Sequence, residues 1–269
     1  MRRRPRIQRK PPDRVDGFYA EPHGRRSWRT LMQMEVPRSQ ALPLSPGEIH
    51  YVLWFIQGSI MNPDVRWRLR RAWGMCERHA WGALAVETAF RPTFLHSPSV
   101  LYDDIMERAV AAWQRATTLG RGRIAQRQLA RRLRPSGPCL MCDMNIARDA
   151  VGAAGPHIIR AGANASSPLK FAGATRSHWL DTVCGRCVGQ GGAQRCRRHL
   201  IEDISAGVAV DLAFHRELVD DIARRIGRYH RSFRWEYRDS DTEDRASLIS
   251  AVGWCTGWRV LIELVRGSA

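Results

Sequence analysis

Residues 184–199 read CGRCVGQGGAQRCRRH, and the expected fold is built around this stretch. Cys184 and Cys187 form one x-x-spaced pair, Cys196 and His199 form another, and a glycine-rich bend connects them. Two intervening residues make a tight turn, so both side chains of a pair can point at one ion about 2.0–2.3 Å away. The spacing therefore predicts one compact Cys₃His zinc site followed by a short helix.

Two further pairs of the same spacing lie upstream: Cys76 with His79, and Cys139 with Cys142. We number the four pairs one to four in chain order. Seven cysteines in a reducing compartment are more often thiolate ligands or buried thiols than disulfides. Eight ligands suffice for two closed Cys₃His sites, so we expect two structural zinc ions without an open catalytic position. The predicted metal ligands are Cys76, His79, Cys139, Cys142, Cys184, Cys187, Cys196 and His199.

The sequence leaves open how the four pairs combine. In one arrangement pairs three and four share an ion, and pairs one and two share the other. In the second arrangement pair two joins pair four, and pair three joins pair one. The second is favoured by the likeness of GMCERHAWGALA (74–85) to QRCRRHLIEDIS (194–205), which an ancient duplication would explain.

Two other metal or thiol chemistries remain alternatives to zinc. Pairs two and three together offer four thiolates, which is the ligand set of a [4Fe-4S] cluster built on Cys139, Cys142, Cys184 and Cys187. Either pair alone has the Cys-x-x-Cys spacing of a redox centre, although no βαβ pattern surrounds it. The seventh cysteine, Cys255, lies in an apolar helical pattern and is predicted to be a buried small hydrophobe.

Helical periodicity fills most of the chain after residue 44, and alternating strand patterns are almost absent. Ser45-Pro46-Gly47-Glu48 has capping-box spacing, while Asn62-Pro63-Asp64 and Ser97-Pro98 are further start signals. Helices are expected near residues 46–60, 63–73, 80–90, 98–119, 122–134, 208–237 and 241–265. The Gly-, Ala-, Ser- and Pro-rich stretch 151–177 predicts a long loop. We therefore predict an all-α helical bundle with irregular zinc-binding loops.

The expected organisation has four parts. Residues 1–44 form a basic, disordered arm, because residues 1–40 carry eleven basic and four acidic side chains among scattered prolines. An N-terminal helical region with pair one (45–134), a zinc-binding region (135–207) and a C-terminal helical pair (208–269) follow. No run approaches about 18 apolar residues and no signal peptide is evident, so a cytoplasmic protein without membrane contact is expected.

The formal charge of +17 and pI near 10.9 favour a polyanionic partner such as DNA or RNA. Of the 43 basic residues only Lys10 and Lys170 are lysine, a bias that an arginine-favouring genome explains equally well. Two segments are candidate nucleic-acid contacts, and the second interleaves arginine with aromatic residues suited to base stacking. The predicted contacts are Arg121, Arg123, Arg127, Arg131, Arg132, Arg134, Arg224, Arg225, Arg228 and Arg231.

The metal pairs carry a resemblance to an uncharacterised bacterial family with CPxC and GxCxxH putative metal-binding motifs. The similar segments are Gly74–His79, Cys139–Cys142, Cys196–His199 and Ala251–Gly257, so the resemblance spans roughly residues 45–265. The family pattern has a cysteine pair ahead of the first GxCxxH, where this chain has IHYVLWFI, and pair three is extra. The resemblance implies metal binding and no particular activity.

No phosphate loop, nucleophile elbow, dinucleotide fingerprint or HExxH helix is present, and this makes an enzyme the less favoured class. The favoured function is a zinc-stabilised helical module that contacts nucleic acid through arginine-rich surfaces. The first alternative is a protein–protein adaptor with structural zinc, in which tryptophan-rich helices make the contact surface. The second alternative is an iron–sulfur or thiol redox protein.

Overall fold

The computed structural model describes residues 44–90, 95–117, 122–146, 155–237 and 239–266, and within these ranges it contains α-helices, two 3₁₀ turns and no strand. The all-α prediction is confirmed. The elements are α2 (Pro46–Gln57), η2 (Ser59–Met61), α3 (Pro63–Ala72), α4 (Glu77–Phe90), α5 (His96–Thr117), α6 (Arg123–Leu133), α7 (Leu140–Asp143), α8 (Pro156–Gly162), α9 (Ser166–Ala174), α10 (Arg176–Trp179), η3 (Leu180–Thr182), α11 (Arg197–Ala206), α12 (Leu212–Arg231), α13 (Thr242–Thr256) and α14 (Arg259–Arg266).

The first helices begin where their capping residues predict. The Ser45 side chain accepts from the backbone of Glu48, and the Glu48 carboxylate accepts from the backbone of Ser45, which completes the capping box of α2. Asn62 caps α3 in the same way by accepting from the two following backbone N–H groups. Both caps satisfy N–H groups that have no partner within their helix.

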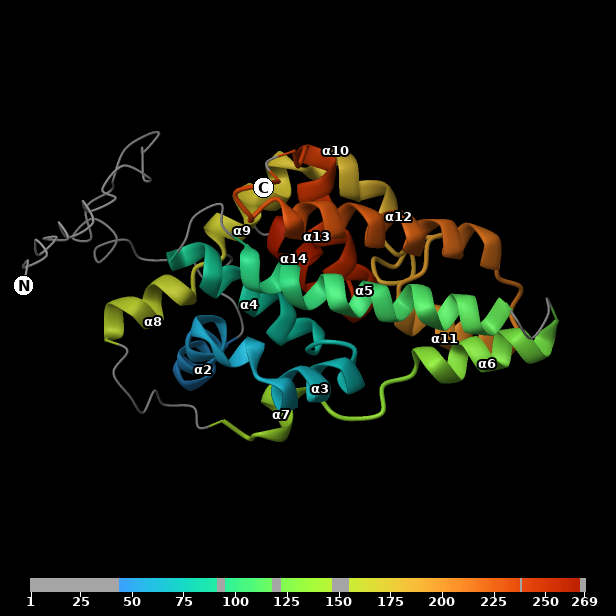
Figure 1. The fold of residues 1–269 in the computed structure, drawn as a ribbon, viewed down its shortest axis with the longest axis horizontal. Helices are drawn as coiled ribbons and strands as arrows, with labels where there is room; N and C mark the ends of the chain where they lie inside the picture. Colours follow the sequence, from blue (N-terminus) through green and yellow to red (C-terminus); the bar gives the residue numbers. More distant parts are fainter. Residues whose placement is uncertain (1–43, 91–94, 118–121, 147–154, 238, 267–269) are drawn as a thin grey trace, which may run out of the picture. The chain divides into compact units, whose positions relative to one another are not determined.

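Helix α4 is buried along almost its whole length and packs against α2, α8, α9, α13 and α14. Two glycines allow the close approach: a Cβ on Gly82 would lie 2.4 Å from the Leu44 side chain, and one on Gly162 of α8 would lie 2.5 Å from Ile49. Beside this group, α5 packs against α12 and α6, and α6 also packs against α11 (Figure 1).

Tryptophans make up much of the core. Trp73 meets Trp254 edge to face with ring centroids 6.3 Å apart, and Trp258 stacks on Trp179 at 5.8 Å. All four rings are buried. Gly253 in α13 lies under Trp258, and a Cβ there would come within 2.2 Å of that ring. The burial of these rings removes them from any contact surface of the kind that the adaptor alternative expects.

Three expectations about the elements are wrong. The stretch 151–177 is no long loop, since its described part from residue 155 contains α8, α9 and the start of α10. Small residues weaken helical periodicity but suit the contacts of α8 and α9 with α4. The pattern 241–265 is two helices, because Gly257 adopts φ +123° between α13 and α14. Ser97 caps no helix, since α5 begins at His96 and both Ser97 donors bind Glu87.

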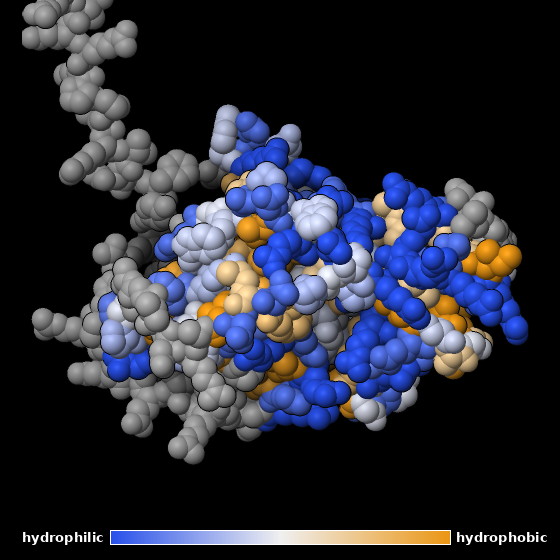
Figure 2. Space-filling model, turned by 90° about the horizontal axis from the view of Figure 1, so that it is seen from below, coloured by the Kyte–Doolittle hydropathy of each residue, from blue (hydrophilic) through white to orange (hydrophobic). Residues whose placement is uncertain are grey.

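The arm predicted for residues 1–44 lies outside the described residues except for its last position. The boundaries expected at residues 134 and 207 remain predictions. None of the described helices is long and apolar enough to cross a bilayer. On the face drawn in Figure 2, hydrophilic residues predominate and separate the hydrophobic areas from one another.

Candidate metal centres

Cluster 1 consists of Cys76, His79, Cys139 and Cys142, and it joins two segments 60 residues apart in sequence. One ligand atom from each residue lies within 4.8 Å of all the others. The Nδ1 atom of His79 lies 3.2 Å from the Cys76 sulfur and 3.5 Å from each of the other two sulfurs. The Cys76 and Cys142 sulfurs are 3.8 Å apart.

The backbone places both halves of cluster 1 at or near the start of a helix. After α3 the chain turns through Trp73 and Gly74, whose φ angles are +61° and +93°, and α4 then begins directly after Cys76. His79 lies in the first turn of α4. Cys139 is the N-cap of α7 and Cys142 lies within it. Because α7 packs against α3, the two pairs meet.

The imidazole of His79 is held from its far side. Its Nε2 atom lies 2.8 Å from Oε1 of Glu48, and the His79 side chain has no exposed surface. Arg78 donates to the same carboxylate. The Ser45 N–H of the α2 cap also donates to this carboxylate and fixes its position further. A carboxylate on Nε2 leaves the Nδ1 lone pair directed at the three thiols, as in carboxylate–histidine–metal arrangements.

Cluster 2 consists of Cys184, Cys187, Cys196 and His199, all within the 16-residue segment 184–199. The Cys187 and Cys196 sulfurs are 3.6 Å apart. The His199 Nδ1 atom lies 3.2 Å from the Cys184 sulfur and 3.4–3.5 Å from the other two. Cys196 is the N-cap of α11 and His199 lies one turn inside it, which repeats the Cys76–His79 arrangement at the start of α4.

A tight backbone loop presents the first two ligands of cluster 2. The Cys187 N–H donates to the Cys184 carbonyl at 3.0 Å, and the Gln190 N–H donates to the Gly185 carbonyl at 2.9 Å. Gly185 is required because a Cβ would lie 2.8 Å from the Gln190 carbonyl oxygen. The buried carboxylate of Asp203 on α11 receives arginine side chains from this loop and from the segment before Cys196.

In each cluster the distances between ligand atoms suit one tetrahedrally coordinated ion. Bonds of about 2.3 Å to sulfur and 2.0–2.1 Å to nitrogen, at tetrahedral angles, place two sulfurs about 3.8 Å apart and a sulfur about 3.6 Å from a nitrogen. The Cys76–Cys142 and Cys187–Cys196 sulfur distances are 3.8 and 3.6 Å, the six sulfur-to-Nδ1 distances are 3.2–3.5 Å, and all ligand atoms of a cluster lie within 4.8 Å of one another. Each cluster can therefore surround a single metal ion with four protein ligands.

The pKa values in the two clusters reflect shared protons. Hydrogen bonding to Cys76 lowers the pKa of Cys139 to about 3, and the same hydrogen bond, with burial, raises the pKa of Cys76. In cluster 2, hydrogen bonds from Cys187 and Cys196 lower the pKa of Cys184. The reciprocal hydrogen bond raises the pKa of Cys187 to about 11. A metal ion that binds all three thiolates of a cluster must therefore displace protons.

These positions select among the alternatives. Pairs one and two meet and pairs three and four meet, so the exchanged pairing is wrong. The four cysteines of pairs two and three belong to different clusters, and each cluster offers only three thiolates, so they do not form the ligand set proposed for a [4Fe-4S] cluster. All seven cysteines are free thiols, and Cys255 is buried.

Glu48 supports cluster 1 although the sequence indicates only its role in the capping box of α2. A glutamate one turn into a helix carries no local signal for a histidine 31 residues later. His178, which lies six residues before pair three, joins neither cluster and lies 3.5 Å from Glu243 instead.

The described arginines of α6 and its C-cap, which the sequence predicts as nucleic-acid contacts, are exposed. Exposed side chains without an ion pair to any described carboxylate are Arg123, Arg127, Arg131 and Arg132. Arg134 is exposed and donates to the Ser205 hydroxyl at 3.0 Å. Arg121 lies outside the described residues. Arg123, Arg127 and Arg131 follow one another at four-residue spacing, so they form a row of positive charges along one exposed face of α6.

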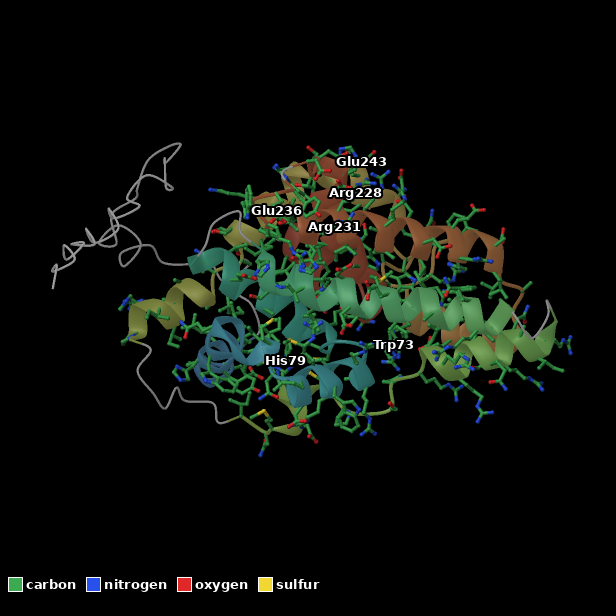
Figure 3. All side chains as sticks on the ribbon, in the orientation of Figure 1. Trp73, His79, Arg228, Arg231, Glu236 and Glu243 are labelled. Carbon is green, nitrogen blue, oxygen red and sulfur yellow. The ribbon has the colours of Figure 1, made fainter. Side chains whose placement is uncertain are left out.

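The arginines of the second segment are mostly engaged within the protein. Arg224 pairs with Asp221, Arg225 with Asp221 and Glu243, and Arg228 with Asp244. Figure 3 labels Arg228 and Arg231 on α12 and Glu243 on α13, with His79 elsewhere among α2, α3 and α4. Arg231 is exposed, and no carboxylate of the described chain pairs with it. This segment is less suited to phosphate contact than α6.

Comparisons of the chain with protein-family models, with curated proteins and with solved structures found no match. The family resemblance noted from the short motifs therefore rests on those motifs alone. The two Cys/His clusters that could bind metal are the part of it that the structure bears out.

Proposed function

We propose that the protein is a helical module stabilised by two zinc ions and that it binds nucleic acid through the exposed arginines of α6. Three cysteines and one histidine at tetrahedral ligand distances, with no coordination position left for water or substrate, are typical of structural zinc. Cluster 1 would crosslink the α2–α4 region to α7, and cluster 2 would anchor the loop before α11. In this role metal binding contributes directly to folding free energy.

The observation that carries the nucleic-acid proposal is the contrast between α6 and α12. Both helices are rich in arginine, but those of α12 are largely neutralised by neighbouring carboxylates. Four exposed guanidinium groups of α6 have no such partner in the described part of the chain. Unpaired guanidinium groups along one helix suit the phosphates of a backbone, because each contact releases condensed counterions.

Fluorescence anisotropy with labelled single-stranded RNA, single-stranded DNA and duplex DNA tests this function. Four phosphate contacts would lower the affinity about 50- to 150-fold between 50 and 200 mM salt. The double substitution Arg123→Gln/Arg127→Gln should reduce the slope of log affinity against log salt by about 1.4–1.8.

The matched control for this test removes two exposed arginines that are paired on α12, by Arg216→Gln/Arg224→Gln. It changes the net charge equally and should leave the slope nearly unchanged. The proposal is wrong if the wild-type protein binds none of the three probes at 50 mM salt, or if the two double variants lose affinity equally.

A protein-docking role is the second candidate. Trp54 on α2 and Trp67 on α3 are 53% and 57% exposed, and Arg71 lies 4.6 Å from the centroid of the Trp67 ring. Exposed tryptophan beside arginine is common in protein interfaces. Recovery of one defined protein after nuclease treatment, abolished by Trp54→Ala/Trp67→Ala, would favour this role over nucleic-acid binding.

A further inference from the structure

A cleft of about 640 Å³ lies between α3, α5, α6 and the segment that follows α6. Its volume falls within the usual range of ligand sites, about 300–1,000 Å³. The side chains around it are mostly cationic. Six arginines line the cleft: Arg70, Arg108, Arg115, Arg131, Arg132 and Arg134. The first and last of them, Arg70 and Arg134, are 64 residues apart, so folding rather than a local sequence run brings the six together.

The charge of the cleft is only slightly balanced by acids. One carboxylate, Glu107, lines it, and Arg70 is paired with Asp104 at 2.7 Å. Throughout the described ranges no carboxylate forms an ion pair with Arg108, Arg131 or Arg132. Like charges held together without counterions destabilise a fold, and a bound anion offsets this repulsion.

Arg108 is the most constrained of the six. Its guanidinium carbon lies 4.1 Å from the centroid of the Trp73 ring, which fixes the plane of the group. One of its terminal nitrogens, Nη1, is buried and has no hydrogen-bond acceptor. Burial, together with the positive charges of Arg70 and Arg197, lowers its pKa. A half-buried guanidinium in this position lacks the anionic partner that such groups usually have.

The rest of the wall limits the kind of anion. The remaining lining residues in the described part of the chain are Ala111, Ala112 and Ser136, and none of the described residues that line the cleft offers an aromatic ring on which a base could stack. Planar guanidinium groups bind phosphate oxygens in a bidentate manner. Recognition here would therefore depend on charge and oxygen geometry rather than on an apolar or aromatic surface.

We propose that this cleft binds two adjacent phosphate groups, with Arg108 as the fixed anchor and Arg131 and Arg132 closing on them from α6. Such a pair of phosphates occurs in a nucleic-acid backbone and in a free oligophosphate. If the phosphates belong to nucleic acid, the inference rests on the proposed function. It then adds where on the protein the nucleic-acid backbone is bound.

Isothermal titration of the zinc-loaded full chain with pyrophosphate tests the cleft, and anisotropy with a labelled oligonucleotide tests the nucleic-acid source. The cleft variant is Arg131→Gln/Arg132→Gln. The control is Arg216→Gln/Arg224→Gln, which removes the same charge from exposed positions of α12 that do not line the cleft. All four positions are exposed, so the variants should fold, and their melting curves and zinc content verify this.

The cleft variant should weaken pyrophosphate binding at least about tenfold, whereas the control should weaken it less than about threefold. If the oligonucleotide competes with pyrophosphate, the phosphates come from nucleic acid. If the oligonucleotide binds without competing, the ligand of the cleft is a free oligophosphate. If it does not bind at all while pyrophosphate does, the proposed function fails and the cleft site stands. Equal weakening by both variants, or no heat of binding at millimolar pyrophosphate, would overturn the inference even if the oligonucleotide binds.

Discussion

Replacing Glu48 by Gln should weaken metal binding at cluster 1 and leave cluster 2 unchanged. The Glu48 carboxylate lies 2.8 Å from Nε2 of the fully buried His79, so the substitution removes a charge-assisted hydrogen bond from the imidazole. Loss of such an outer partner typically lowers metal affinity 10- to 100-fold, which corresponds to about 1.4–2.7 kcal/mol. Gln at this position still permits the capping box of α2, so the helix start is retained.

Competition with a colorimetric chelator at constant pH measures the effect, because it distinguishes an ion that is bound more weakly from one whose affinity is unchanged. Ser45→Ala provides the first control: it removes half of the α2 cap but leaves the Glu48–His79 contact, so both affinities should remain. Glu202→Gln provides the second, since Glu202 lies 3.9 Å from Nε2 of His199, beyond hydrogen-bond distance. Glu48 does not support the cluster 1 ion if Glu48→Gln leaves both ions as tightly bound as in the wild type, or weakens both equally.

Three further outcomes follow from the structure. Cys184→Ser should reduce the bound zinc from two ions to one by elemental analysis, while Cys255→Ala, outside both clusters, should leave two. Gly253→Ala should lower the free energy of unfolding by about 1–3 kcal/mol, because its Cβ would overlap the adjacent indole; Gly173→Ala in α9, which meets no atom within 4 Å, should raise it by about 0.5–1 kcal/mol. Burial, reinforced by a nearby arginine, lowers the pKa of His215 to about 4, below its ordinary 6.5. The unfolded state therefore binds the proton first, and stability should fall by up to about 3 kcal/mol from pH 6.5 to 4. The variant His215→Gln, compared with the wild type at equal zinc content, should lose less stability between pH 6.5 and 4.

The spacing of cysteine and histidine in the sequence predicted which residues form the two clusters, because a Cys-x-x-Cys or Cys-x-x-His turn is a local structure. It could not predict the pairing of cluster 1. That pairing depends on the packing of α7 against α3, a tertiary contact with no local pattern. The contact between Glu48 and His79 is tertiary as well, so the sequence does not indicate it. Of the arginine cleft, the sequence indicated the arginines of α6 but not Arg70 and Arg108.

Helix starts were predicted well where a side chain caps the backbone, as at Ser45, Asn62 and Asp241. Helices made of small residues were missed. In α8 and α9 glycine and alanine allow close contact with α4, and this contact stabilises helices whose own amphipathic pattern is weak. The break at Gly257 was missed because glycine inside an apolar pattern is compatible with a continuous helix until the φ angle is known.

The two clusters differ in what a metal ion would contribute to folding. Cys187 and Cys196 are nine residues apart, whereas His79 and Cys139 are separated by 60. The entropic cost of closing a flexible loop grows as about (3/2)RT ln n, so closing the longer one costs about 1.7 kcal/mol more. Cluster 2 can thus form early from a short segment with its own hydrogen-bonded loop. Cluster 1 can form only when α7 has reached α3. An ion there would therefore stabilise the tertiary arrangement of the helices, and its loss would release the N-terminal helices first.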